Sequence, residues 1–378
     1  MEGEVASGTR KPIFKIHDGE IMSIYDEINF ILTDNAPQLK RSMKFDYNEI
    51  RNRYYDIPRP EHPNRKQRAD FNQSYTELYK QFDNSTEYHR ALDRDTFNGD
   101  YLMPTFDDLT EEYPEDRVPL LDQKSVAHQR QFLTPHQQFW AENGYLIAQG
   151  LIASEVCDEY IALRESLELG PHRFPTFTPY VEHDVIRRMC CSVAVNTIIN
   201  DLIGEELGLH FNLSQYVSTE RGWHQDEYLN PPQTFGRYLA VWIAIDDVPE
   251  ASGPFEFVPG SHKLPTVARD KVMPFLKQEF QLGYSPSYDW SVHSASFVNP
   301  AYFYKMATSG APPVKFLGKK GDVLFWHSRL IHRGSPPENR NIYRPGLIGH
   351  YSPIRSARWF GSDIRRYGNG GYYWHFDH

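Results

Sequence analysis

The spacing of hydrophobic residues changes at about Gly208, from helical periods before it to short runs after it. Thr134–Gln137 combines an N-cap, a first-turn proline and a capping-box glutamine, and Gly144 is placed to end the helix that they begin. Tyr145–Ala148 is an apolar run of strand length. These residues predict a helix followed directly by a strand.

Two more helices are expected before Gly208. Ser154 is a candidate cap for the first and Gly170 is placed to stop it, while residues 192–202 form the second. The helix that begins at Ser154 has an apolar side for the core, made of Val156, Tyr160, Ile161, Leu163 and Leu167.

After Gly208 the chain is rich in β-forming residues, and glycines and prolines separate the runs. Helices followed by many short strands favour an α+β, mainly β fold, an antiparallel barrel or double sheet with helices packed outside. The expected strands are Leu209–Ser218, Tyr238–Ile245, Phe255–Val258, Val323–Trp326 and Gly346–Tyr351.

Residues 1–130 follow a different pattern from residues 131–378, the main domain. Prolines between residues 58 and 63, and the polar, mostly basic string after them, interrupt any long period. We therefore expect an irregular N-terminal extension that packs on the main domain or forms a lid over it. One short helix is expected at residues 72–82, with Tyr75, Leu78, Tyr79 and Phe82 on one face.

Composition narrows the class of partner. A formal charge of -10 argues against a nucleic-acid surface, which needs clustered cations. No signal peptide is indicated, and no run approaches the roughly 20 apolar residues that cross a bilayer. Three cysteines, two of them adjacent, do not make a disulfide framework, so a reducing compartment such as the cytoplasm is favoured. The expected partner is a small molecule.

A metal site is predicted by His224-Gln225-Asp226 together with His332. Two imidazoles and one carboxylate can occupy one face of a six-coordinate iron and leave three positions open. Alternate residues of a strand point to the same side, so one short strand supplies His224 and Asp226. His332 ends the apolar run that begins at Val323, and this distant strand supplies the third ligand.

Three other histidines compete for this role. His327 lies five residues before His332, on the opposite face of an extended strand, and is expected to make a core or outer-shell hydrogen bond. His262 lies in a Pro-Gly-Ser-His turn, where a structural role is expected. His375-Phe376-Asp377 repeats the ligand spacing but has no distant histidine or arginine after it, so we do not expect it to bind metal.

Arg344 follows His332 by twelve residues, at the start of the next strand. A planar guanidinium grips a carboxylate through two parallel hydrogen bonds. The alternative is a surface salt bridge, which contributes little. Its position favours the first role, in which Arg344 binds the far end of a dicarboxylate whose other end chelates the metal.

At these residues the chain resembles the phytanoyl-CoA dioxygenase family of iron(II)- and 2-oxoglutarate-dependent oxygenases. The similar segments occur in family order over about residues 132–352. They are Trp223–Asp226, Tyr238–Asp247, Gly253–His262, Gly321–Phe325 and His332–Ser335 through Arg344.

The resemblance implies a double-stranded β-helix, or jelly-roll, core of the cupin type. It implies that His224, Asp226 and His332 hold iron(II) and that Arg344 holds the cosubstrate 2-oxoglutarate. The implied reaction with O2 is an oxidative decarboxylation that releases succinate and CO2 and hydroxylates the substrate. Because Asp226 is present, halogenation is disfavoured, whereas desaturation, cyclisation and epimerisation stay open as alternatives.

The resemblance also suggests further contacts to 2-oxoglutarate. Ser335 is similar to the hydroxyl partner of the carboxylate in the family, although the additional Arg333 shifts it by one residue. Asn212 or Gln215 resembles the amide contact of the family, and which of the two faces inward is left open.

The substrate is less defined than the cofactors. The sequence lacks an evident basic cluster for coenzyme A, which favours a small polar metabolite or a natural-product intermediate. The aromatic tail at residues 367–378 has no similar segment in the family and is expected in core packing or in an interface, such as one between copies of the chain. The competing hypotheses are an inactive jelly-roll binding module and a cupin-type metalloenzyme that does not use 2-oxoglutarate, and Arg344 argues against both.

Overall fold

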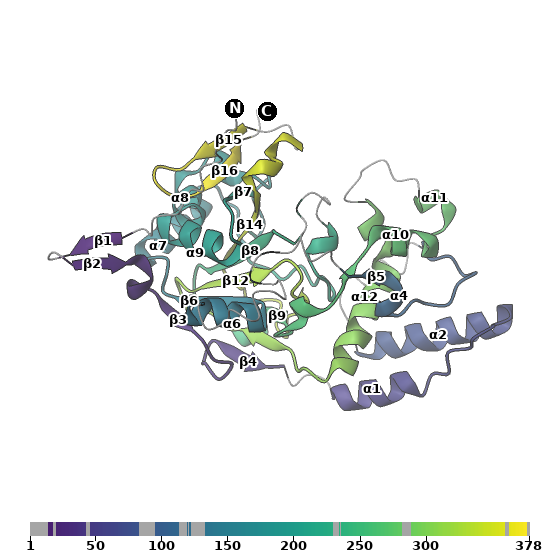
Figure 1. Cartoon of the computed structure of the whole chain (residues 1–378). Coiled ribbons are helices and arrows are strands. Elements are labelled where there is room, and N and C mark those ends of the chain that lie inside the picture. Colours follow the sequence, from purple (N-terminus) through teal and green to yellow (C-terminus); the bar gives the residue numbers. More distant parts are fainter. Residues whose placement is uncertain are drawn as a thin grey trace, which may run out of the picture.

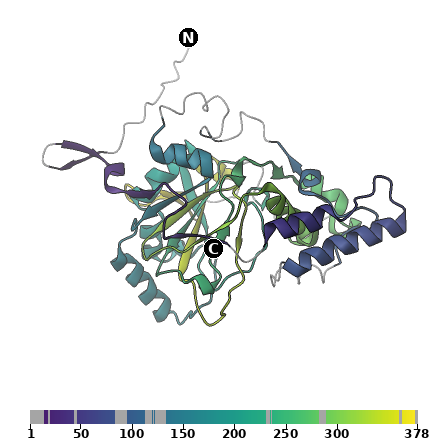
Figure 2. The same ribbon diagram turned by 90° about the horizontal axis from the view of Figure 1, so that it is seen from below.

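The fold consists of a jelly roll and a helical region beside it (Figure 1; Figure 2). This computed structural model describes residues 14–17, 20–42, 46–82, 95–112, 119, 121, 133–229, 234, 236–281, 289–359 and 363–375.

The larger sheet of the jelly roll has eight strands. They are β3 (Asn29–Ile31), β6 (Tyr145–Gln149), β7 (Leu207–Leu213), β8 (Leu239–Ala244), β12 (Val323–His327), β14 (Gly346–Pro353), β15 (Asp363–Arg366) and β16 (Tyr372–His375). Their order is β15-β16-β7-β14-β8-β12-β6-β3. Neighbours are antiparallel except β16 and β7, which run parallel.

The smaller sheet faces the larger one across a buried cluster. Its strands are β4 (Leu39–Arg41), β9 (Phe255–Phe257), β11 (Val314–Phe316) and β13 (His332–Gly334), in the order β13-β9-β11-β4. Aromatic rings from the two sheets meet between them, with ring centroids 4.8 Å apart for Phe255 and Trp326 and 5.4 Å apart for Trp242 and Phe316. The jelly-roll prediction is confirmed.

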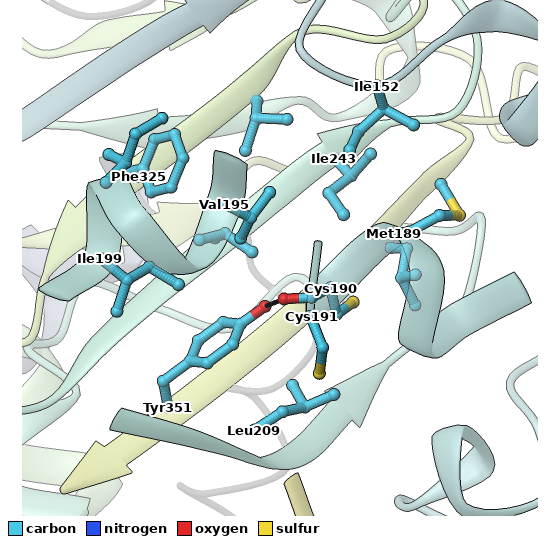
Figure 3. Packing of buried hydrophobic residues seen from close by; sticks show 14 of the residues in the cluster. Ile152, Met189, Cys190, Cys191, Val195, Ile199, Leu209, Ile243, Phe325 and Tyr351 are labelled. Carbon is cyan, nitrogen blue, oxygen red and sulfur yellow. Dashed lines mark hydrogen bonds between the residues drawn. The ribbon is translucent and has the colours of Figure 1, made fainter. Parts of the chain in front are cut away.

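Helices cover the outer face of the larger sheet. They are α6 (Pro135–Asn143), α7 (Ser154–Ser166), α8 (Asp184–Cys190) and α9 (Val193–Ile203). Figure 3 shows the apolar residues packed between these helices and the strands. Within that cluster the Tyr351 hydroxyl donates a hydrogen bond to the Cys190 carbonyl at 2.8 Å.

The expected helix signals hold for α6 and α9 and fail in part for α7. The Thr134 capping box and the left-handed Gly144 bound α6 as predicted, and Ser192 caps α9. Ser154 is the first residue of α7 rather than its cap, since Ala153 takes that position without a side-chain hydrogen bond. Leu167 is exposed rather than packed in the core.

The N-terminal extension is more regular than the sequence predicted. β3 adds to β6 at one edge of the larger sheet, and β4 adds to β11 at one edge of the smaller sheet. These strands are too short to carry a clear period, and they form because an open sheet edge offers them backbone partners. β1 (Phe14–His17) and β2 (Glu20–Ser23) form a separate hairpin.

A helical lobe, as we call it, combines this extension with an insertion between β9 and β11. Its helices are α1 (Tyr47–Tyr55), α2 (Arg65–Phe82), α4 (Phe106–Leu109), α10 (Arg269–Val272), α11 (Gln278–Gln281) and α12 (Asp289–Ser309). β5 (Thr110–Glu111) pairs with β10 (Thr266–Val267) beside them. The predicted helix at residues 72–82 is the second half of α2, and it buries Tyr75, Leu78 and Tyr79.

The described part of the aromatic tail packs against the jelly roll. β15 and β16 extend the larger sheet beyond β7, and Trp374 is fully buried. Core packing was one of the two expected roles, the other being an interface, and residues 376–378 lie outside the described part of the chain. Among the described helices, none combines the length and apolar character needed to span a membrane.

Candidate metal centre

The backbone brings His224 and His332 together across an isolated antiparallel bridge. The His224 amide donates to the His332 carbonyl at 3.0 Å, and the His332 amide donates to the His224 carbonyl at 2.9 Å. The predicted strand through His224 and Asp226 is therefore wrong in its length, because one bridge residue replaces it. The bridge still places the two imidazole rings side by side, with centroids 4.3 Å apart.

Asp226 completes the site. Its Oδ1 lies 3.6 Å from His224 Nε2 and 3.5 Å from His332 Nε2. One nitrogen or oxygen of each residue lies within 4.8 Å of the others, and within the described residues no other group of this kind is found. Two imidazoles and one carboxylate are the ligand set of a facial triad, so the donor set fits iron(II).

Hydrogen bonds behind the site aim the ligand atoms. The Nδ1–H groups of His224 and His332 donate to the carbonyls of Gly222 and Leu330, at 2.7 and 2.8 Å. Carbonyls only accept, so Nδ1 carries the proton, and the Nε2 lone pair of each ring is available to a metal. Trp326 Nε1–H donates to Asp226 Oδ2 at 3.0 Å, which leaves Oδ1 toward the two imidazoles.

Burial and mutual charge set the protonation of these ligands. Burial, with help from His332, lowers the pKa of His224 to about 3, and burial also lowers the pKa of His332. Burial opposes the ionisation of Asp226, but the electrostatic attraction of His332, and after it of His224, outweighs burial and lowers the pKa of Asp226. Neutral imidazoles beside an ionised carboxylate are the state that a metal requires.

Two of the three competing histidines, His327 and His262, have structural roles. His327 ends β12 in the larger sheet, and its Nδ1 accepts a hydrogen bond from the Arg329 amide at 3.0 Å. The expected core hydrogen bond is confirmed, but a single strand running on to His332 is not, because His332 lies in the other sheet. His262 is buried in a short 3-10 helix with its Nε2 3.3 Å from the Ala141 carbonyl.

Arg344 is a buried cation two residues before β14. Its amide donates to the Tyr216 carbonyl at 2.8 Å, and its guanidinium carbon lies 5.2 Å from the centre of the Trp242 ring. Burial lowers the pKa of Arg344 to about 10. Among the described residues no carboxylate pairs with it, and its buried Nε has no hydrogen-bond partner. A charge buried without a counter-ion is costly, which indicates that an anion binds here.

The structure gives Ser335 a different partner from the one that the resemblance suggested. Its hydroxyl donates to Glu256 Oε2 at 2.9 Å, and the same oxygen accepts from Arg333 Nε at 2.7 Å. Arg333 and Ser335 are two residues apart and share a side of the strand, whereas His332 points the other way. The one-residue shift therefore places the hydroxyl on the side opposite to the ligand.

Asn212 and Gln215, the two candidates for the amide contact to 2-oxoglutarate, have different outcomes. Asn212 Nδ2 donates to the Ile348 carbonyl at 2.9 Å and lies 3.8 Å from Cys190 Sγ, in the cluster beneath the covering helices. It therefore faces away from the ligands. Gln215 precedes Tyr216, whose carbonyl receives the Arg344 amide, and its contact with the cosubstrate stays a prediction.

Two side chains that support the ligands from behind are not predicted by the sequence. Trp326 is predicted only as a strand residue, although a buried indole usually requires an acceptor for its N–H. Tyr302 lies in a segment that we did not assign to any element, and its hydroxyl reaches Gln225. No local pattern marks it.

Comparison with known proteins decides the family. The family model described as phytanoyl-CoA dioxygenase (PhyH) matches residues 140–342, more than half of the chain, and this match spans the whole triad. The chain belongs to the phytanoyl-CoA dioxygenase family. Its members are iron(II)- and 2-oxoglutarate-dependent oxygenases, and iron(II) and 2-oxoglutarate are its cofactors. No curated protein matches the chain.

Several solved structures are similar to this member of the phytanoyl-CoA dioxygenase family. The epimerase SnoN in complex with Fe3+, alpha ketoglutarate and nogalamycin RO is 20% identical over 60% of this chain and 84% of its own, with a TM-score of 0.43. The carbocyclase SnoK from nogalamycin biosynthesis is 19% identical over 65% and 98%, with a TM-score of 0.45. EctD from S. alaskensis with 2-oxoglutarate and 5-hydroxyectoine is 14% identical over 68% and 84%, with a TM-score of 0.42.

Proposed function

We propose that this oxygenase hydroxylates a small polar metabolite or natural-product intermediate, with His224, Asp226 and His332 as its iron(II) ligands and Arg344 as its 2-oxoglutarate anchor. The observation that carries the proposal is the convergence of the three ligand atoms together with the buried guanidinium of Arg344, whose Nε has no partner among the described residues. A binding module without catalysis has no need to keep a three-residue metal site beside this buried cation.

The protein residues hold and orient the reactants. His224, His332 and Asp226 would hold the metal, and Arg344 would receive the carboxylate of 2-oxoglutarate that is not at the metal. Bound iron(II), with 2-oxoglutarate and O2, supplies the oxidising power that replaces a substrate C–H by C–OH. One oxygen atom of O2 enters succinate, the other enters the product, and CO2 leaves. Burial of all four side chains excludes bulk water from the reacting atoms.

A buried histidine on the Asp226 side supports a polar substrate. His350 lies opposite Ala240 on the inner face of the larger sheet, in the same row as Trp326. Its Nδ1 is hydrogen bonded to the Tyr238 hydroxyl, and within the described residues its buried Nε2 has no partner. With the Tyr238 hydroxyl as donor to Nδ1, the Nε2–H is directed to an acceptor oxygen on the substrate.

The test of the proposed function is an anaerobic titration of the apoprotein with iron(II) and then with 2-oxoglutarate. We expect the weak visible charge-transfer band of a chelated iron-oxoglutarate complex, lost in Asp226→Ala and His332→Ala. Arg344→Gln should bind iron normally and weaken 2-oxoglutarate by roughly 100-fold, since it loses a charge-assisted bidentate pair.

Arg340→Gln is the matched control for Arg344→Gln. Arg340 lies four residues before Arg344, is largely exposed, and pairs with the buried carboxylate of Glu220. It should leave the band and the affinity for 2-oxoglutarate unchanged. Bound iron without any band would refute the proposal and favour a cupin-type metalloenzyme that does not use 2-oxoglutarate. With the band established, product analysis separates hydroxylation from desaturation, cyclisation and epimerisation.

A further inference from the structure

Gln225, the residue between the two ligands of the His-x-Asp segment, is fully buried and connects three parts of the chain. Its Nε2 donates to the Arg329 carbonyl at 2.8 Å. Its Oε1 accepts from the Tyr302 hydroxyl at 3.0 Å. The side chain therefore uses both ends of its amide on the side of the segment away from the ligand atoms.

The Arg329 contact links the first two ligands to the third. Arg329 lies in the turn between β12 and β13, three residues before His332. Next to it, the Glu227 amide donates to the Ser328 carbonyl at 3.0 Å. The segment that carries His224 and the turn that leads to His332 are thus joined by a side chain and by a backbone bond, independently of any metal.

The Tyr302 contact brings in the helical lobe. Tyr302 lies in α12 and is fully buried. Asn299, one turn earlier on the same side of α12, lies against Gly222, where an added Cβ would come within 2.7 Å of Asn299 Nδ2. The Gly222 carbonyl is the acceptor that orients His224. One side of α12 therefore runs along the segment from Gly222 to Gln225.

We propose that Tyr302 is a positioning residue for the iron site and that the helical lobe takes part in metal binding through it. A hydroxyl donor at Oε1 fixes which end of the Gln225 amide faces α12, so Nε2 is directed to the Arg329 carbonyl. Without the hydroxyl, Oε1 is a buried acceptor with nothing to accept, and the amide is no longer held in one orientation. This inference rests on the proposed function, since it takes His224, Asp226 and His332 as ligands.

Tyr302→Phe tests the inference, and Tyr304→Phe is its matched control. Tyr304 lies on the same helix and is also buried, but its hydroxyl donates to the Tyr75 carbonyl inside the helical lobe. Each variant loses one buried hydroxyl and one hydrogen bond. We expect Tyr302→Phe to weaken iron(II) binding about tenfold in anaerobic titration and to shift the charge-transfer band. Tyr304→Phe should bind iron(II) with wild-type affinity, although its melting temperature should fall about as much as that of Tyr302→Phe.

A double-variant cycle separates positioning from general destabilisation. Gln225→Met removes both amide contacts while keeping the length of the side chain. If Tyr302 acts through Gln225, the double variant should bind iron no more weakly than Gln225→Met alone. If Tyr302→Phe folds poorly, the measurement on Gln225→Met alone still tests the inference, because this variant must weaken iron binding by itself.

Distinct results would overturn the inference and the proposed function. If wild-type protein gives the band and Tyr302→Phe binds iron as tightly as wild type does, the inference is wrong and the proposed function stands. Equal losses of iron(II) affinity in Tyr302→Phe and Tyr304→Phe would also overturn the inference. If wild-type protein binds no iron(II), both proposals fail.

Discussion

The jelly roll and the helical lobe use their buried polar groups differently. In the jelly roll, the buried ionisable side chains of His224, Asp226 and His332 meet at one point. In the helical lobe, buried tyrosine hydroxyls join one element to another, as Tyr304 does with the Tyr75 carbonyl. The side chains able to perform chemistry therefore lie in the jelly roll, while the hydroxyls of the helical lobe hold backbone segments in place.

Packing density at glycines gives the largest expected difference between the regions. In the jelly roll a Cβ at Gly346 would lie 1.7 Å from Trp242 Nε1, whereas in the helical lobe a Cβ at Gly99 would meet no atom within 4 Å. Gly346→Ala should therefore destabilise the protein by about 3 kcal/mol through overpacking. Gly99→Ala should stay within about 0.5 kcal/mol of wild type. Urea denaturation measures the free energy of unfolding of both variants. Equal transition midpoints for Gly346→Ala and Gly99→Ala would contradict this prediction.

Acid should destabilise the protein through a half-buried jelly-roll histidine. Burial, together with the charge of His350, lowers the pKa of His210 from 6.5 to about 3. Below pH 6.5 the unfolded chain binds a proton that the folded chain refuses, so this stability is present above pH 6.5 and lost as pH falls toward 3. At pH 5 the loss is about 2 kcal/mol for this group.

Urea denaturation of the apoprotein at pH 7 and pH 5 measures this loss. His210→Phe should lose less stability than wild type between the two values, because the variant has no proton to take up at this position. An equal loss in both proteins would show that His210 is not protonated on unfolding in this range.

The third contrast compares two buried tryptophans, of which only Trp326 is hydrogen bonded to a predicted ligand. Trp326 in the jelly roll touches the ligand Asp226 directly, so Trp326→Phe should weaken iron(II) binding by about 10- to 100-fold. Trp140→Phe removes the same atoms, but the buried Nε1 of Trp140 has no partner among the described residues, so its iron affinity should stay at wild-type level. Anaerobic titration compares them. Equal affinities in the two variants would show that the hydrogen bond to Asp226 does not matter.

The sequence predicted the jelly roll and its ligands better than the helical lobe because the determining signals are local there. The capping box at Thr134 needs only four residues, and each expected strand is a run between turns. The ligand residues could be found for the same reason, since a His-x-Asp, a later histidine and an arginine are rare together. Residue alternation would also have placed Ser335 on the opposite side from His332.

The helical lobe could not be found in the same way. Its largest helix, α12, contacts α1, α2, α4 and α11 and also the ligand segment, so it is apolar on several sides and lacks an amphipathic period. Pro300 inside it is a residue that usually ends a helix. Its partners α1 and α2 are more than 200 residues away in sequence, and only tertiary packing brings them together.

Two matched helix caps give the smallest expected effect and test whether the two regions unfold together. Thr134 caps α6 on the jelly roll and Thr105 caps α4 in the helical lobe, each in a complete capping box. Replacing either by Ala should cost about 1 kcal/mol. The helix α12 packs against the other helices of the lobe and also contacts the Gln225 segment. We therefore expect one cooperative transition that both substitutions shift equally. Calorimetry that shows Thr105→Ala lowering only an earlier, separate transition would mean that the lobe opens while the jelly roll stays folded.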